Sequence, residues 1–273
     1  MRARTRSGRT PPASHSGHRR STTMAGEDSR LDARGIHVSF GGVKALSGVD
    51  LSVTRGEVFG LIGPNGAGKT TMVNVLTGFQ PPTQGEVVLD GTPLGAMKPR
   101  DVARAGIARS YQAARLFRDL TVEQNVAVSG IGAGLSGRAA HARAREILDW
   151  MNCGRIADQY ADSLSYGDER RISIARALAL SPSYLLLDEP ASGMNDSECE
   201  ELMRVISEVP RAFGCAVLLI EHNMKVIMGV CARVHVLDGG SSLAEGTPAE
   251  VQSNPAVRRA YLGEKADHAE LAI

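Results

Sequence analysis

Gly63-Pro64-Asn65-Gly66-Ala67-Gly68-Lys69-Thr70-Thr71 is the stretch of sequence that decides the fold. It follows an apolar run at residues 58–62 that is typical of a buried strand, and it leads into a segment that can be helical. A strand, a glycine-rich loop of this kind and a helix, in this order, form a phosphate-binding loop. The sequence therefore predicts a site for a nucleoside triphosphate, with the nine quoted residues around its phosphates.

The residue types of this loop have separate tasks in such a site. Glycines let the backbone turn tightly, so that successive N–H groups point at one anion. Lys69 is expected to reach the β- and γ-phosphates, and the hydroxyl of Thr70 to complete the ligands of a Mg²⁺ ion. The helix that follows directs the positive end of its dipole at the same phosphates. The alternative, a plain glycine-rich turn before a helix, requires neither the lysine nor two hydroxyls in register.

The composition is compatible with a soluble protein of one compact unit or two closely joined lobes. The chain has 273 residues, of which 42% are hydrophobic, enough for a large core. No apolar run approaches the ~20 residues that cross a bilayer. The four cysteines are scattered without a Cys-x-x-Cys pair, which disfavours a zinc site or a disulfide framework and favours reduced thiols in a cytosol.

Charge is distributed unevenly along the chain. Residues 1–23 contain six arginines and no acid, which leaves 25 basic and 30 acidic residues in the remainder. We expect residues 1–30 to form a disordered basic tail, because they lack the apolar side chains that offset the entropy of ordering. This tail could contact nucleic acid or anionic lipid. Alternatively Met24 is the natural start and the preceding residues are a non-native extension, which we favour because a folded pattern begins only at Ile36.

Beyond the tail, short strands alternate with helices. Three segments with β-branched or alternating residues suit an antiparallel sheet, namely residues 36–40, 51–53 and 87–89. Continuous apolar runs, as in buried parallel strands, occupy residues 58–62, 184–187, 216–220 and 234–237. Between Ala113 and Ala179 strand patterns are missing, and residues 138–151 and 169–180 have a helical pattern instead. We therefore predict an α/β fold with a P-loop NTPase core, an antiparallel β subdomain and a helical subdomain inserted at about 113–176.

A second chemical motif is YLLLDEP at residues 184–190. A hydrophobic strand that ends in acid is the Walker B pattern, in which Asp188 would hold Mg²⁺ beside Thr70, directly or through water. Glu189 is placed where a carboxylate could polarise a water in line with the γ-phosphate. A strand can also end in Asp merely because it reaches solvent, but two adjacent carboxylates downstream of a P-loop favour catalysis.

Between these motifs lies LSYGDERR at residues 164–171, where the chain resembles an ATP-binding-cassette (ABC) ATPase. The resemblance runs from about Ile36 to residues 263–264, although the commonest form of this signature is Leu-Ser-Gly-Gly-Gln. It implies that Ser165 and Gly167 cap the γ-phosphate bound to a second ABC ATPase subunit, in a head-to-tail dimer with two ATP molecules. Tyr166 replaces a glycine of the motif, and Asp168 and Glu169 stand in place of amides, which predicts a retained function with altered polarity around the phosphate. By itself the octapeptide could be an ordinary helix cap with Ser165 at the N-cap.

The same resemblance assigns roles to several isolated residues. Gln112 matches the Q-loop glutamine, which would contact Mg²⁺ or the lytic water and sense a transmembrane partner. His222 matches the switch histidine that contacts the γ-phosphate, so Glu189, His222, Gln112 and Lys69 form the expected catalytic set. Phe40 matches the aromatic residue that stacks on adenine, although a strand-end phenylalanine could equally belong to the core. Asn195 stands in the D-loop where many relatives carry Asp.

Three further segments are similar to the ATP-binding subunits of branched-chain, or hydrophobic, amino-acid importers: ARLFRDLTV at 114–122 with Asn125, EHNMKVIM at 221–228 and AYLGE at 260–264. This similarity implies ATP hydrolysis at the cytoplasmic face of the membrane, with separate permease subunits and, indirectly, an extracytoplasmic substrate-binding protein. Alternatives are a subunit for urea, amide or lipopolysaccharide transport, or a non-transport ABC ATPase acting on nucleic acid. We expect no nucleic-acid partner, because no coiled-coil or zinc insertion and no tandem cassette is visible.

Overall fold

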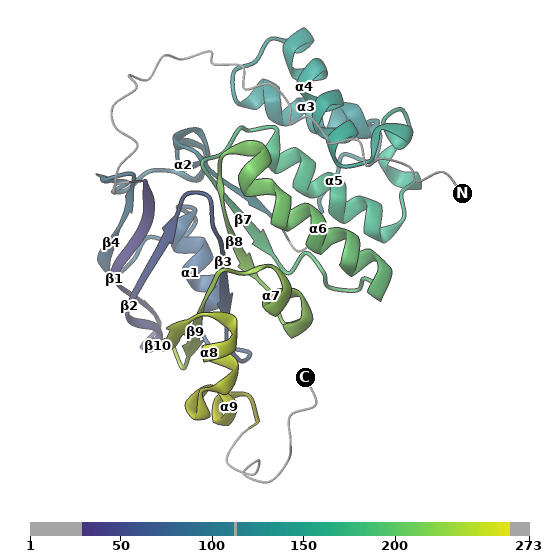
Figure 1. Ribbon diagram of the computed structural model, residues 1–273. Coiled ribbons are helices and arrows are strands. Elements are labelled where there is room, and N and C mark those ends of the chain that lie inside the picture. The colour runs from purple at the N-terminus through teal and green to yellow at the C-terminus, as the bar shows by residue number, and fades with distance from the viewer. Residues whose placement is uncertain (1–28, 112–113, 263–273) are drawn as a thin grey trace.

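The computed structural model describes residues 29–111 and 114–262, and two β-sheets organise this part of the chain (Figure 1). The larger sheet has six strands in the order β10-β9-β3-β8-β7-β6. Its strands pair in parallel except for β10, which is antiparallel to β9. Their bounds are Val58–Ile62 (β3), Ile107–Ser110 (β6), Tyr184–Asp188 (β7), Ala216–Ile220 (β8), Arg233–Asp238 (β9) and Ser241–Gly246 (β10).

The smaller sheet is antiparallel, with four strands in the order β2-β1-β4-β5. β1 and β2 form a hairpin in which Phe40 pairs with Val43 across two glycines. Gly41 and Gly42 both have positive φ, a conformation that favours glycine at such a turn. The bounds of the four strands are Arg30–Phe40 (β1), Val43–Thr54 (β2), Gln84–Leu89 (β4) and Thr92–Pro93 (β5).

The central strands of the larger sheet are buried on both faces. In β3, Phe59 and Leu61 pack toward the smaller sheet, whereas Val58 and Ile62 pack into the core on the opposite side. The helix α1 (Lys69–Leu76) lies between the two sheets and shares the first of these cores (Figure 1). Burial of both faces explains why the parallel strands have continuous apolar sequences instead of alternating ones.

Helices cover the second face and build a lobe between β6 and β7. Within that lobe the buried side chain of Asn125 donates hydrogen bonds to the carbonyls of Phe117 and Thr121, which fixes the irregular segment after β6. The remaining helices are α2 (Pro99–Ala105), α3 (Val122–Gly132), α4 (Gly137–Trp150), η1 (Gly154–Ile156), η2 (Ala161–Ser163), α5 (Tyr166–Leu178), α6 (Asp196–Phe213), α7 (Met224–Val230), α8 (Pro248–Ser253) and α9 (Pro255–Leu262). Within the described ranges, no helix is long and apolar enough to cross a bilayer.

The expectation that the folded pattern begins only at Ile36 is wrong, because β1 begins at Arg30. Leu31 and Ala33 are buried, but the charged residues between and after them hide the strand pattern. Asp32 is accommodated because it accepts a hydrogen bond from the hydroxyl of Ser52 (2.7 Å) and pairs with Arg34 (2.9 Å). Burial of the carboxyl favours a higher pKa, but these two partners together with the charge of Arg30 hold the pKa of Asp32 below its ordinary value.

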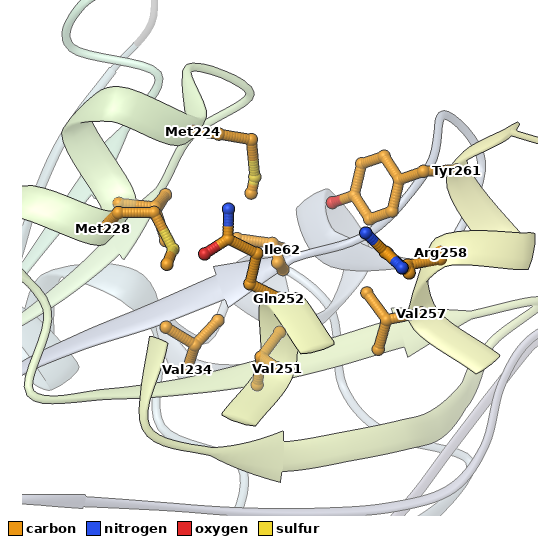
Figure 2. Close-up of a pocket in the computed structure, with 10 residues that line it drawn as sticks. Ile62, Met224, Met228, Val234, Val251, Gln252, Val257, Arg258 and Tyr261 are labelled. Atoms are coloured by element: carbon orange, nitrogen blue, oxygen red, sulfur yellow. The ribbon is translucent and has the colours of Figure 1, made fainter. Parts of the chain in front are cut away.

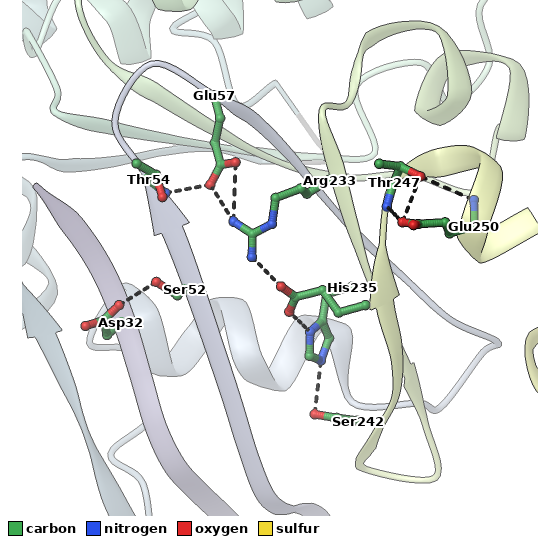
Figure 3. Close-up of polar contacts among 10 residues, drawn as sticks. Asp32, Ser52, Thr54, Glu57, Arg233, His235, Ser242, Thr247 and Glu250 are labelled. Atoms are coloured by element: carbon green, nitrogen blue, oxygen red, sulfur yellow. Dashed lines mark hydrogen bonds and ion pairs between the residues drawn. The ribbon is translucent and has the colours of Figure 1, made fainter. Parts of the chain in front are cut away.

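A polar network joins the C-terminal hairpin to the start of β3 (Figure 3). The guanidinium of Arg233 on β9 pairs with Glu57, the residue before β3, and with Glu245 on β10. Glu245 also accepts from Nδ1 of the buried His235, 2.7 Å away. Side chains thus reinforce the backbone pairing of β9 with β3 at the N-terminal end of β3, opposite the end that leads into the phosphate loop.

Candidate nucleotide-binding site

The loop between β3 and α1 has the tight backbone that the sequence predicts. Gly63 has a φ of 149°, and a Cβ at this position would lie 2.1 Å from the carbonyl oxygen of Leu237. Gly68 has a φ of 102°, and a Cβ there would lie 2.8 Å from the carbonyl oxygen of Ala45. Neighbouring strands therefore press on both ends of the loop, and only glycine fits at either end.

Lys69 is buried and its ammonium curls back over the loop. Its Nζ donates to the carbonyl oxygens of Gly63 (2.6 Å) and Pro64 (3.0 Å). Burial lowers the pKa of Lys69, and the nearby carboxylates of Glu189 and Asp188 oppose this shift. An ammonium has three donors and the loop takes two, so one remains for an anion bound over the loop.

Helix α1 begins at Lys69, directly after the loop. Its N-cap is Gly68, which has no side chain to accept from the N–H groups of the first turn. Thr70, in that turn, is exposed. Unsatisfied N–H groups and an exposed hydroxyl at a helix start form a site for phosphate, as the sequence predicts.

The structure brings the Walker B acids near the loop. Asp188 is the last residue of the buried strand β7, and its Oδ2 pairs with Arg109 Nη2 at 2.6 Å. Glu189 follows with a φ of 47°, a left-handed conformation that is unusual for a residue other than glycine. The Oε1 of Glu189 lies 2.7 Å from the Nε2 of His222. Two of the four expected catalytic residues, from segments 33 positions apart, are thus in hydrogen-bond contact.

The signature segment is at the start of α5. Ser165 is the N-cap of this helix, and its hydroxyl accepts from the N–H of Asp168 and donates to the carboxylate of the same residue. Ser165 is therefore the N-cap of a helix, as the alternative interpretation of the octapeptide predicted. Ser165 is exposed, so the cap does not prevent contact with a second molecule. Gly167 is buried, and a Cβ there would lie 2.5 Å from the Oε1 of Glu198.

The structure describes Phe40 but not Gln112, the two other predicted site residues. Phe40 ends β1 with 49% of its surface exposed, so the alternative that placed it in the core does not describe its environment. Gln112 lies outside the described residues.

With this geometry in place, comparison with known protein families decides the classification. A family model described as "ABC transporter" matches residues 46–192, which is more than half of the chain. The chain belongs to the ABC transporter ATP-binding family. A second family model, "Branched-chain amino acid ATP-binding cassette transporter", matches residues 243–267 of this ABC ATPase.

Individual relatives of this ABC ATPase agree with that classification. LivG of Salmonella typhimurium, a high-affinity branched-chain amino acid transport ATP-binding protein, is 43% identical over 249 residues, covering 86% of this chain and 98% of LivG. The ADP conformation of the cassette MJ1267 has a TM-score of 0.78 at 29% identity, covering 86% and 98% of the two chains. A dimeric post-hydrolysis state of the cassette MJ0796, bound to ADP and Pi, has a TM-score of 0.71 at 27% identity, covering 80% and 98%. The predicted ABC-type fold class is confirmed.

Sequence reasoning missed two charged residues of the ABC site. Glu221 is buried, and its carboxylate accepts from the N–H groups of Ala191 (2.6 Å), His222 (3.1 Å) and Asn223 (3.3 Å). Burial raises the pKa of Glu221, and these three bonds oppose the rise. Glu221 thus ties the segment after β7 to the segment after β8. The position of Glu221, directly after an apolar strand and next to His222, was the signal available in the sequence.

Arg109 is the other missed residue, and it links Asp188 to helix α1. It pairs with Asp188 and donates to the Oδ1 of Asn74 in α1 at 2.7 Å. Its guanidinium also lies 4.9 Å from the centre of the Tyr111 ring. Because Arg109 and Asp188 have side chains only 9% and 12% exposed, each charge depends on the other in the nucleotide-free protein.

Arg109→Leu should therefore lower the free energy of unfolding of the nucleotide-free protein by about 3 kcal/mol, because it leaves the Asp188 carboxylate largely buried without its partner. Magnesium nucleotide should recover part of this loss by supplying positive charge beside Asp188. Denaturant unfolding with and without MgADP measures both effects. Arg118→Gln is the matched control, since Arg118 is 62% exposed where it pairs with Glu169 and should change stability by under about 1 kcal/mol. If the two variants lost equal free energy of unfolding, the proposed dependence of Asp188 on Arg109 would be wrong.

Asn195 has a structural task as the N-cap of α6. Its side chain accepts from the N–H of Glu198, and the Glu198 carboxylate accepts from the N–H of Asn195, which completes a capping box. The same Glu198 is the residue against which Gly167 packs. The D-loop and the signature helix therefore meet at one glutamate.

Proposed function

We propose that this chain is the ATP-hydrolysing subunit of an importer for branched-chain or hydrophobic amino acids, bound at the cytoplasmic face of the membrane to separate permease subunits. The observation that carries the substrate class is the 43% identity to LivG over 98% of its length. The match of residues 243–267 to the branched-chain amino acid cassette family supports it independently of the ATP site. An extracytoplasmic substrate-binding protein would deliver the amino acid to the permeases.

The residues present fit a Mg²⁺ ion that would accompany ATP. Mg²⁺ prefers oxygen ligands and is commonly held by one or two carboxylates together with substrate phosphates. Asp188 and the exposed hydroxyl of Thr70 are of this kind, and Gln112 is a further candidate. No group of three acidic, histidine or cysteine residues within the described ranges forms a full protein cage. Bound there, the ion would neutralise charge that develops on the transferred phosphoryl group.

The chain's own residues divide the remaining work of hydrolysis. Lys69 and the amides of the loop, from Gly63 to Thr71, would bind and orient the phosphates. Glu189 would take a proton from the attacking water, and His222, 2.7 Å from it, would hold that carboxylate in position. Phe40, exposed at the tip of the β1–β2 hairpin, would stack on adenine.

A second ATPase subunit would complete each site. The exposed Ser165 and the buried Gly167 are at the N-terminus of α5, where a hydroxyl and backbone N–H groups can receive a phosphate from another protomer. The dimeric form of MJ0796 supports this arrangement by analogy. The partner could be a second copy of this chain or a paralogous subunit.

A hollow of about 550 Å³ on the helical lobe suits the permease contact. It is bounded by Leu116 and Arg118 of the segment after β6 and by Tyr166 and Arg170 of the signature helix. Phe117 beside it is 49% exposed and packs 5.3 Å from the guanidinium carbon of Arg176. An apolar anchor among arginines that directly borders the signature helix is suited to transmit permease movement to the ATP site.

Uptake of labelled leucine by cells or vesicles with the matching permease pair tests this function. We expect uptake to require this chain, and to fall at least tenfold with Phe117→Glu while the basal ATPase rate of the isolated subunit is retained. Ile131→Glu is the matched control, because Ile131 is 50% exposed on α3 of the same lobe and does not border the hollow. Leucine uptake that proceeds without this chain, or a selective response to urea, amides or lipopolysaccharide, would contradict the proposal.

A further inference from the structure

An apolar pocket of about 220 Å³ is lined by residues of α7, α8 and α9 and of the strands β3 and β9 (Figure 2). Helix α7 contributes Met224 and Met228 to its wall, β3 contributes Ile62, and α8 and α9 contribute Val251 and Val257. An apolar cavity of about 150 Å³ is sufficient to bind benzene, so this pocket has room for a ligand of roughly nine non-hydrogen atoms.

The walls of this pocket belong to the elements that carry the ATP machinery. Ile62 is the residue immediately before Gly63 of the phosphate loop. Helix α7 begins at Met224, two residues after His222. Tyr261 of α9 also lines the pocket, and the backbone of Gly63 opposes the rise that burial causes in the pKa of its hydroxyl. A ligand in the pocket would thus contact residues that adjoin the phosphate loop and residues that adjoin His222.

The polar groups of the pocket are positive or neutral. Arg258 and Tyr261 lie on one side of it, opposite Met224 and Met228 (Figure 2). Burial raises the pKa of Tyr261 to about 12, so its hydroxyl keeps a proton that it can donate. No acidic residue lines the pocket within the described chain, and Arg258 forms no ion pair with a described carboxylate. The positive charge at the rim therefore complements an anion.

We propose that this pocket binds a short apolar monocarboxylate, of the type of a branched 2-oxo acid, with its carboxylate on Arg258 and its hydrocarbon chain against Met224 and Met228. The ligand is a carboxylate because Arg258 forms no ion pair within the described residues and because the other lining residues, apart from Gln252 and Tyr261, are apolar. A zwitterionic amino acid of the same size is disfavoured, since its ammonium group would lose water and find no carboxylate.

Titration of the full chain, labelled with ¹³C at the methionine methyl groups, tests this proposal by NMR. The probes are 4-methyl-2-oxopentanoate, L-leucine and 4-methylpentan-1-ol, which share a branched chain but differ in charge. Among the nine methionines, we expect Met224 and Met228 to show the largest shifts, assigned with Met→Leu variants. The oxo acid should bind at least about tenfold more tightly than leucine or the alcohol, as expected for a charge-assisted hydrogen bond.

Neighbouring arginines on α9 provide the matched control. Arg258→Gln should weaken binding of the oxo acid about tenfold or more, whereas Arg259→Gln, which does not line the pocket, should leave it within about twofold. Unmoved Met224 and Met228 signals, equal binding of leucine, or equal losses in the two variants would each overturn the proposal. Because no permease is needed, failure here would not bear on the proposed import function.

Discussion

Glu189→Gln should lower the rate of ATP hydrolysis by about 10²-fold or more while ATP still binds. The carboxylate is the group placed to accept a proton from water, and general-base assistance typically contributes about 10²–10⁴-fold. Glutamine has nearly the same shape and can keep a hydrogen bond to His222 Nε2, but it cannot accept that proton. Phosphate release at saturating ATP measures the rate, and equilibrium binding of labelled ATP measures what is retained.

This variant should also accumulate as a dimer in the presence of ATP, because two triphosphates that are not cleaved hold the subunits together. Size-exclusion chromatography with and without ATP detects this change. Glu200→Gln is the control, since Glu200 is an exposed glutamate that pairs only at the surface with Lys225. Turnover of Glu189→Gln close to that of the control would rule out Glu189 as the base.

Lys69→Ala should act earlier in the cycle and weaken ATP binding by roughly 10- to 100-fold. The expected size follows from a charge-assisted hydrogen bond to phosphate, which contributes about 1.5–3 kcal/mol. The neutral alanine also leaves Asp188 and Glu189 without the nearby ammonium, so the negative charge of the site opposes an anionic ligand. Titration with a fluorescent ATP analogue measures the change in affinity.

Lys98→Ala is the comparison for this second variant, because Lys98 is an exposed lysine before α2, away from the loop. Both proteins should melt cooperatively, which shows that altered affinity is not unfolding. If Lys69→Ala binds the analogue as tightly as Lys98→Ala, the phosphate-contacting role of Lys69 is incorrect.

The sequence predicted the parts of the fold that depend on residues close together in the chain. Apolar runs predicted the buried strands β3, β7 and β8, because burial on both faces requires such runs. The pairing of Arg109 with Asp188 joins positions 79 residues apart, and no periodic pattern contains that information. The early start of β1 was missed for a related reason, since Asp32 is accommodated in the strand by its contacts with Ser52, 20 positions away, and with Arg34.

In the signature segment, too, contacts between distant residues could not be predicted from the sequence. The sequence identified Ser165 and Gly167 by their motif but did not predict what Tyr166 would contact. In the structure Tyr166 receives a hydrogen bond from Arg170 and packs against Gly193, where an added Cβ would lie 2.9 Å from the ring. The tyrosine that replaces glycine thus joins the signature helix to the loop after β7. Boundaries of the helical subdomain, at about 113–176, remain a prediction.

The close fit of the β9–β10 hairpin around the phosphate loop has a consequence for shortened forms of this protein. The carbonyl of Leu237 abuts Gly63, and the N–H of Gly240 bonds the carbonyl of Ala67 while its own carbonyl receives the N–H of Ser47. A fragment that stops after β8 would retain every residue of both Walker motifs, yet it would lose the scaffold that shapes the first of them. The smallest active fragment is therefore not defined by the Walker motifs alone, because it must also contain the β9–β10 hairpin.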